Sequence, residues 1–147
     1  MTIKMKLTIV YSEYKKIYQE YVLLLESGIF YNVYNNDAGI INRLLNYKMK
    51  YCNDTYIVGF PISSLHNVLD TLKDNNINFV VLDKNDMNEY FISDKLKNNK
   101  NQYNNFIFDY KRLNYLNKRI DDIHLKLLQM VNNSNIEDLL LKIERLL

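Results

Sequence analysis

Two apolar runs that meet at one glycine constrain the fold of this chain more than any other feature. Residues 21–25 and 29–34 are rich in branched and aromatic side chains, which suit half-buried β-strands. Gly28 lies between the runs, and because it has no Cβ it can adopt the positive φ of a tight connection. The sequence therefore predicts a β-hairpin centred on Gly28, with Phe30 just past the turn at the rim of a sheet.

The segment before the hairpin changes from a strand pattern to a helix pattern. Every second residue from Ile3 to Ile9 is apolar, which predicts a strand with one solvent-facing side or, alternatively, a frayed terminus. From Ser12 onward, apolar and aromatic residues recur at helical spacing. We therefore expect a short helix that runs to Tyr21 with Ser12 as its N-cap.

Helices and strands alternate after the hairpin. One helix is expected to begin at Asp37, acting as N-cap, and another to be capped by Ser63 or Ser64. Strands are expected at residues 48–51, 55–60, 78–82 and 89–93. Residues 79–82 are entirely apolar, which favours a central strand, and the last strand would lie at an edge. This order predicts an α/β fold, with a mixed sheet covered by short helices.

The last third of the chain predicts a C-terminal helical hairpin. A Lys- and Asn-rich stretch at residues 95–105 has no periodicity, so we expect an exposed loop there. Beyond it, apolar residues at spacings of three and four form an interaction seam of Leu113, Leu116, Ile120, Ile123, Leu127 and Met130. Ser134 and Glu137 form a capping box for a last helix. The expected organisation is an α/β domain at 1–94, a loop at 95–105 and helices at 106–147.

The net charge and the numbers of cysteine, histidine and glycine residues argue against several classes of function. The net charge of +2 is too small to indicate a nucleic-acid partner unless the charges are clustered. One cysteine and two histidines are too few for a disulfide or a usual zinc site. Lys4 and Lys6 interrupt the first apolar segment, so we expect no signal peptide and no membrane contact, while the single cysteine Cys52 fits a reducing, cytoplasmic location. With only three glycines there is no phosphate-binding loop, so we expect no ATPase.

The order of motifs from Tyr14 to about Asp83 resembles domain I, the mismatch-recognition domain, of the MutS mismatch-repair family. Gly-Ile-Phe-Tyr-Asn at residues 28–32 stands where that family has Gly-Asp-Phe-Tyr-Glu. An Asp-Ala helix start follows at 37–38, and Val-Gly-Phe-Pro at 58–61 resembles the family's Ala-Gly-Ile-Pro. The resemblance implies that Phe30 stacks on a mispaired base, whereas the alternative is a core phenylalanine.

Asn32 departs from the family pattern, in which a glutamate hydrogen-bonds the mispaired base. Asparagine donates and accepts hydrogen bonds but brings no negative charge beside the DNA. A carboxylate near phosphates penalises ordinary duplex, so its loss is expected to weaken discrimination more than affinity.

Basic residues alternate with aromatic ones from residue 95 to residue 119, where they either hold phosphates or form an ordinary solvated helix face. The expected nucleic-acid contacts are Phe30, Tyr31, Asn32, Lys95, Lys97, Lys100, Lys111 and Arg112. Together with these residues, the resemblance to MutS domain I implies a non-catalytic accessory protein that binds duplex or structured DNA in repair. The alternative is a protein-interaction adaptor, a helper subunit of a larger DNA- or RNA-processing complex. Its C-terminal helices would contact another protein or a second copy.

A catalytic site is the weaker interpretation. Asp109 and Lys111 form an Asp-x-Lys like that of metal-dependent nucleases, and Asp83 or Asp86 would supply a second carboxylate for Mg²⁺. The helical spacing that follows places Asp109 at a helix start instead. We therefore expect no catalytic residue, no metal and no cofactor.

Overall fold

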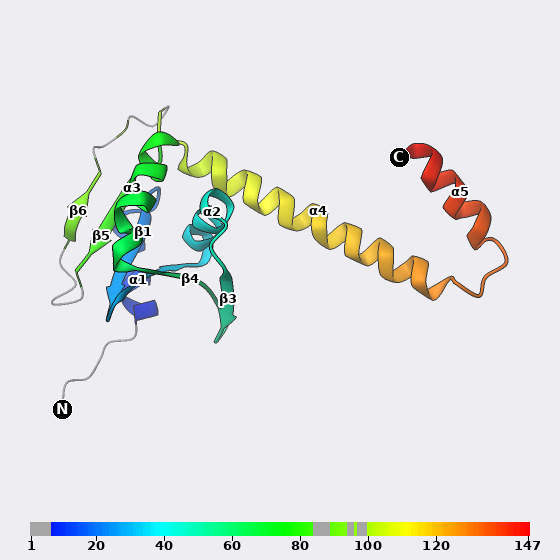
Figure 1. Ribbon diagram of the computed structural model, residues 1–147, viewed down its shortest axis with the longest axis horizontal. Helices are drawn as coiled ribbons and strands as arrows, with labels where there is room; N and C mark the ends of the chain where they lie inside the picture. Colours follow the sequence, from blue (N-terminus) through cyan, green and yellow to red (C-terminus); the bar gives the residue numbers. More distant parts are fainter. Residues whose placement is uncertain (1–6, 84–88, 94–95, 97–99) are drawn as a thin grey trace. The chain divides into compact units, whose positions relative to one another are not determined.

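The fold is described from a computed structural model over residues 7–83, 89–93, 96 and 100–147. The chain divides into two units, Met1–Tyr110 and Lys111–Leu147, and each is described by itself. The first unit contains a six-stranded sheet of strand order β3-β4-β2-β1-β5-β6 (Figure 1). Its strands are β1 (Val22–Ser27), β2 (Phe30–Tyr34), β3 (Met49–Cys52), β4 (Thr55–Pro61), β5 (Phe79–Leu82) and β6 (Glu89–Ile92).

The sheet is mixed, as the sequence predicts. β1 pairs with β2 in antiparallel orientation and with β5 in parallel orientation. The apolar strand β5 lies in the interior of the sheet between β1 and β6, and β6 forms an edge. The predicted fold class is thereby confirmed, together with the central position of β5.

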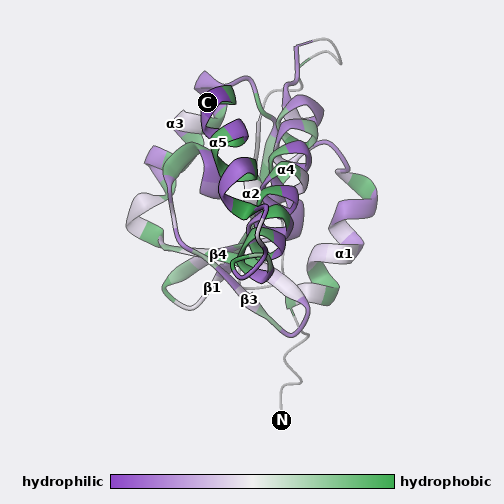
Figure 2. Cartoon of the chain, turned by 90° about the vertical axis from the view of Figure 1, so that its right-hand side faces the viewer, coloured by the Kyte–Doolittle hydropathy of each residue, from purple (hydrophilic) through white to green (hydrophobic). Residues whose placement is uncertain are grey.

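Helices cover both faces of this sheet. The helix α1 (Leu7–Ile17) packs on one face, whereas α2 (Asn35–Leu45) and α3 (Leu65–Asp74) pack on the other (Figure 2). Along β1, Val22 and Leu24 enter the α2–α3 core while Leu23 and Leu25 enter the α1 core. A strand that is buried on both faces must be apolar throughout, which explains the uninterrupted run in the sequence.

The predicted hairpin forms at Gly28. Ser27, the last residue of β1, pairs with Phe30, the first residue of β2, so Gly28 and Ile29 make a two-residue loop. Gly28 has a φ of +61°, and Ile29 is not among the residues with positive φ. A positive φ at the first loop residue alone is the pattern of a type II′ turn, whose twist suits a hairpin.

Asp37 is not the N-cap that the sequence predicts, because α2 begins two residues earlier, at Asn35. Its side chain is completely buried. The carboxylate accepts hydrogen bonds from the Tyr11 and Tyr103 hydroxyls, from the Lys15 ammonium at 2.9 Å and from the Leu23 amide. A buried carboxylate is tolerated only when it is paired and hydrogen-bonded, so Asp37 joins three helices to β1.

The N-terminal strand is a second correction. Residues 1–6 lie outside the described residues, and from Leu7 the chain is helical, so residues 7–9 belong to α1. Ser12 lies within this helix rather than at its start, and its hydroxyl donates to the Thr8 carbonyl oxygen at 2.9 Å. The expected helix is therefore present, but it begins earlier and ends before Tyr21.

Two long segments follow the sheet: α4 (Tyr103–Gln129), which passes from the first unit into the second, and α5 (Ile136–Leu146). The predicted loop at 95–105 is wrong in its last residues, because Tyr103 opens α4 and its ring is buried. The helical pair is confirmed, but the N-cap of α5 is Asn135, without the capping box expected at Ser134. Among the described residues, no helix is long and apolar enough to cross a membrane.

Candidate nucleic-acid interface

Exposed apolar side chains lie at the end of the sheet where the Gly28 hairpin turns. Ile29 is 72% exposed and Phe30 is 43% exposed, although both are large apolar side chains. Ile62, directly after β4, is also exposed, and its amide donates to the Ile29 carbonyl oxygen at 3.0 Å. We call Ile29, Phe30 and Ile62 the hairpin rim. Neighbouring exposed apolar groups at one end of a sheet are typical of a surface that binds a ligand or another macromolecule.

Phe30 is held by backbone pairing rather than by burial of its ring. It pairs with Ser27 on β1 and with Pro61 on β4. Both neighbours are uncharged, and Phe30 keeps 43% of its surface exposed between them. The expectation that Phe30 lies at the rim of the sheet therefore agrees with the structure, and the core alternative does not.

Asn32 lies two residues further along the same strand, between Leu25 on β1 and Gly59 on β4. A Cβ built on Gly59 would lie 3.2 Å from the Asn32 Oδ1 atom, so this glycine leaves room for the amide. A side-chain hydrogen bond joins Asn32 to Tyr34, whose pKa is raised by burial and lowered in part by this bond. Asn32 is thus a partly exposed, fixed amide beside Phe30.

Tyr31 does not belong to this surface. It points to the opposite face of the sheet, where it is buried and its ring stacks on Phe60 with centroids 5.8 Å apart. Side chains alternate between the two faces of a strand, so Phe30 and Asn32 cannot share their face with Tyr31. The structure therefore places Tyr31 in the core, away from the face that carries Phe30, and the expected nucleic-acid contact at Tyr31 stays a prediction.

The expected basic contacts are not gathered around Phe30. Lys95 and Lys97 lie outside the described residues. Lys100 is exposed, but its neighbour Asn101 donates to the Glu20 carbonyl oxygen just before β1, whereas Phe30 follows the end of β1. A six-residue strand is about 20 Å long, so Lys100 and Phe30 occupy opposite ends of it.

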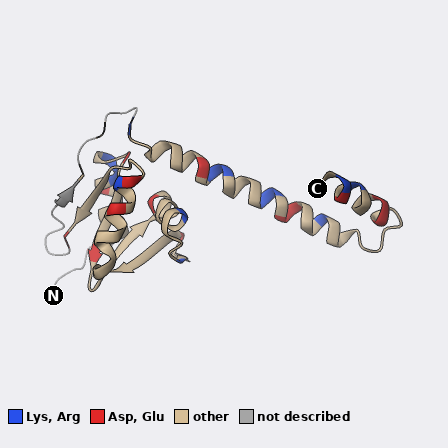
Figure 3. Ribbon diagram, turned by 45° about the horizontal axis from the view of Figure 1, so that its top comes forward, with Lys and Arg blue, Asp and Glu red and all other residues tan. Residues whose placement is uncertain are grey.

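Lys111 and Arg112 belong to the second unit, where Lys and Arg recur along α4 (Figure 3). Of the aromatic residues that precede them on α4, Phe108 is 68% exposed, whereas the other three are packed against the first unit. Tyr103 is buried against Asp37, Phe106 packs on the core, and the Tyr110 ring lies over Gly39. The basic–aromatic segment predicted from the sequence is therefore divided between packing residues and an exposed helix face.

Sequence reasoning missed Ile29, Gly59 and Ile62. A glycine inside a predicted strand is a known signal for close approach of another group, and Gly59 carried that signal. Ile29 is the second residue of the hairpin loop and Ile62 directly follows Pro61, and apolar residues are unusual at such positions. Among the described residues, no three His, Cys, Asp or Glu side chains form a metal-binding group, and Asp86 lies outside those residues.

The fold and the rim together define an α/β recognition domain with an aromatic residue presented at a hairpin. The family model of MutS domain I matches residues 6–106, about two thirds of the chain. The protein therefore belongs to the MutS domain I family and carries a MutS-like mismatch-recognition domain. The match ends within the first turns of α4. No curated protein matches the sequence.

Proposed function

We propose that this protein is a non-catalytic accessory protein of DNA repair that binds duplex or structured DNA through the hairpin rim. The observation that carries the proposal is the exposure of Phe30, 43%, at the position that resembles the family's base-stacking phenylalanine. An aromatic ring that is exposed at the end of a sheet can enter a base step without loss of the fold. Apolar wedges of this kind partly unstack a duplex and bend it.

The surroundings of Phe30 support contact with a base more than contact with a phosphate. Its strand neighbours Ser27 and Pro61 are uncharged, and Asn32 offers an amide. An amide can pair with donors and acceptors on a displaced base. It does not repel the phosphates of a correctly paired duplex, so discrimination is expected to be weaker than with a glutamate.

Replacement of Phe30 by alanine tests the proposal. We expect Phe30→Ala to weaken DNA binding by about 1–3 kcal/mol, as for other stacking aromatics, because the ring contributes its contacts only in the complex. Fluorescence anisotropy with matched and mismatched duplexes measures the binding. The control is Tyr51→Ala, which removes another exposed aromatic ring from the same sheet.

The core alternative gives a different result. A buried phenylalanine costs about 3–5 kcal/mol of unfolding free energy when it is replaced by alanine. A large fall in melting temperature for Phe30→Ala, or equal binding losses for Phe30→Ala and Tyr51→Ala, would contradict the proposal.

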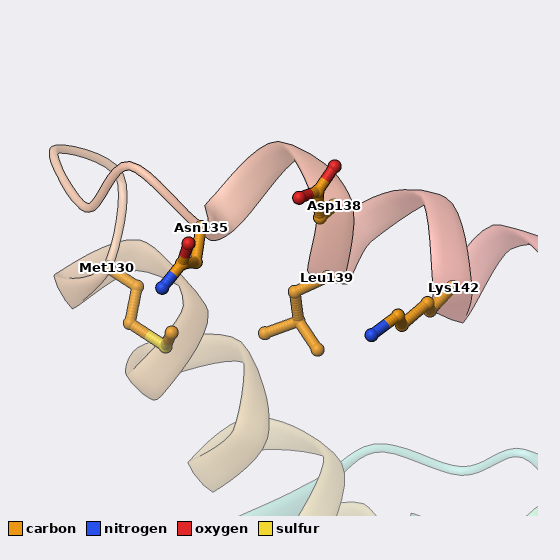
Figure 4. A pocket seen from close by; sticks show the side chains of 5 residues that line it. All are labelled: Met130, Asn135, Asp138, Leu139 and Lys142. Carbon is orange, nitrogen blue, oxygen red and sulfur yellow. The ribbon is translucent and has the colours of Figure 1, made fainter.

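The exposed seam favours a second candidate, the protein-interaction adaptor. Leu113, Ile120 and Ile123 are all exposed on α4, Ile120 by 62%. Leu116 and Leu127 are half-buried, and Met130 lines a shallow pocket with Leu139 of α5 (Figure 4). The second unit thus leaves much of its apolar seam uncovered, as a helix that joins a second copy or another helical protein would.

Light scattering distinguishes this candidate. If the seam joins two copies, the mass exceeds 17.7 kDa and falls for Ile120→Asp, because a buried charge opposes association. The matched control is Leu125→Asp, at an exposed position of α4 outside the seam. A wild-type protein that stays monomeric at high concentration would exclude the homodimer.

A further inference from the structure

One face of α4 in the second unit carries five cations. Lys111 and Arg112 form a first pair, Lys118 and Arg119 a second pair, and Lys126 follows. Seven residues make nearly two turns of an α-helix, so positions seven apart return to almost the same face. These five residues, which we call the basic stripe, therefore line one side of a continuous helix.

The basic stripe is available to a ligand. All five side chains are exposed. Within the described part of the chain, none of them forms an ion pair with a carboxylate, although Asp122 lies on the same helix face. Exposed cations without partners retain their full charge toward an approaching anion. Asp122 offsets one of the five positive charges, so this helix face keeps a clear excess of positive charge.

Tyr115 lies between the two basic pairs and is 60% exposed. The Arg119 guanidinium lies 5.7 Å from the centroid of the Tyr115 ring. Contact between a guanidinium and an aromatic face restricts the motion of the long arginine side chain. Arg119 is therefore partly ordered before any ligand binds, which lowers the entropy that binding costs.

The spacing of the stripe suits a nucleic-acid backbone. With a rise of 1.5 Å per residue, the two basic pairs are about 10.5 Å apart, and the whole stripe spans about 22 Å. The major groove of B-DNA is about 12 Å wide between its two rows of phosphates. Each basic pair can therefore reach a different phosphate row, or successive phosphates of a single strand.

We propose that the basic stripe of α4 binds the phosphodiester backbone of nucleic acid, independently of base sequence and separately from the hairpin rim. The rim is apolar and its strand neighbours are uncharged, so it cannot supply phosphate contacts from those residues. The stripe lies beyond Phe106, where the match to MutS domain I ends. It provides the electrostatic part of affinity, which phosphate contacts dominate.

The test compares two double variants of the full-length chain. Lys118→Gln with Arg119→Gln removes the middle of the stripe, whereas Lys142→Gln with Arg145→Gln removes one lysine and one arginine from exposed positions of α5. Both variants lower the net charge equally, and glutamine preserves helix propensity. Circular dichroism checks that both stay helical.

The measurement is the dependence of binding on salt, by anisotropy with a labelled duplex and a labelled single strand. Each phosphate contact contributes about 0.9 to the slope of log K against log salt for duplex, and about 0.7 for single strands. We expect the α4 double variant to reduce the slope by about 1.8 on duplex or about 1.4 on single strand. The α5 double variant is expected to leave it unchanged.

Equal slopes for wild type and both variants, equal reductions in both variants, or no binding at low salt would overturn the proposal. Its failure can be told apart from failure of the hairpin rim. Phe30→Ala removes a stacking contact, so it changes affinity without changing the salt slope. If Phe30→Ala does not change affinity while the α4 variant still reduces the salt slope, the result supports phosphate binding by the basic stripe and contradicts DNA binding by the hairpin rim.

Discussion

At the scale of single residues, Asn32 is a position where the chemistry of this domain departs from the Gly-Asp-Phe-Tyr-Glu pattern of the family that residues 28–32 resemble. Its amide lies beside Gly59 and is joined to Tyr34 by a hydrogen bond. A glutamate at this position is one methylene longer and charged at neutral pH. The change therefore alters both the fit over Gly59 and the electrostatics beside Phe30.

We expect Asn32→Glu to lower affinity for matched duplex more than affinity for mismatched duplex. The carboxylate repels phosphates in every complex, but only a displaced base can donate a hydrogen bond to it. Anisotropy titrations with the two duplexes measure the difference, and Asn32→Gln serves as the control of equal length without charge. Equal losses on both duplexes would show that residue 32 does not read a base.

The buried cluster around Asp37 makes stability depend on alkaline pH. Burial, reinforced by the nearby Asp37 carboxylate, raises the pKa of Tyr11 and of Tyr103 far above their usual value of 10.0. Above about pH 10 the unfolded chain loses these protons while the folded chain keeps them, so the free energy of unfolding falls as pH rises. Burial lowers the pKa of Lys15, which acts in the opposite direction below its usual value of 10.5.

We expect Tyr11→Phe with Tyr103→Phe to be less stable than wild type at neutral pH, because Asp37 loses two donors. The same variant is expected to lose less stability between about pH 9 and about pH 11, with up to about 1.4 kcal/mol per pH unit removed for each tyrosine. Urea unfolding at a series of pH values measures both effects. Parallel pH profiles for variant and wild type would contradict the assignment.

Local patterns predicted the exposed position of Phe30 but not the role of Asp37. A turn signal and a strand signal are both encoded by neighbours in the sequence, so the rim position of Phe30 follows from residues 28–34. Asp37 next to an expected helix start looks like an N-cap for the same reason. Its true partners include Tyr11 and Tyr103, which are 26 and 66 residues away, and no local pattern reports them.

At the scale of elements, the first turns of α4 are fastened to α2 by close packing. A Cβ built on Gly39 would lie 2.6 Å from the Tyr110 ring, closer than real contacts allow. The Tyr110 hydroxyl also approaches the Met49 sulfur at 3.9 Å. Gly39 therefore provides the space in which this ring lies.

We expect Gly39→Ala to destabilise the protein by about 1–3 kcal/mol, although alanine normally favours a helix interior by about 1 kcal/mol over glycine. The added methyl group forces the Tyr110 ring out of its position. In a Tyr110→Ala background the clash is absent, so the same change is expected to be neutral or stabilising. A double-mutant cycle by urea unfolding measures this coupling, and additive effects would contradict it.

Strands were predicted better than helix ends. The sequence marks each strand by apolar runs between turn residues, and all the strands from β1 to β6 appear near their expected positions. Period-two alternation over the first residues predicted a strand where residues 7–9 are helical, because a short pattern fits either period. Serine is a common N-cap residue, so the sequence predicts caps at Ser12 and Ser134. In the structure α1 begins at Leu7, and the N-cap of α5 is Asn135.

At the scale of the whole molecule, the sequence contains no Gly-x-x-x-x-Gly-Lys-Ser/Thr motif. We expect neither binding nor hydrolysis of ATP, because that motif forms the loop that cradles a triphosphate in P-loop proteins. Isothermal calorimetry at micromolar protein measures this. Saturable heat on addition of ATP with Mg²⁺ would contradict the expectation.

The two units of the structure meet further along the chain than the loop that the sequence predicts. A polar stretch without periodicity suggested a loop through residue 105 and helices as a separate segment. The first unit instead extends to Tyr110, because Tyr103, Phe106 and Tyr110 use one face of α4 to pack on the sheet domain. Helix periodicity shows which residues share a face, but not which neighbour that face meets.

The packing of Tyr110 against Gly39 limits where the gene for this domain can be recombined without loss of the fold. The match to MutS domain I ends at Phe106, whereas the packed unit needs Tyr110, one turn further on. Recombination directly after Phe106 would remove Tyr110, so Gly39 would lose the ring that packs on it and α4 would be cut within its first turns. Only a recombination breakpoint beyond Tyr110 would transfer the whole first unit. We therefore expect the recognition domain and the first turns of α4 to be inherited together.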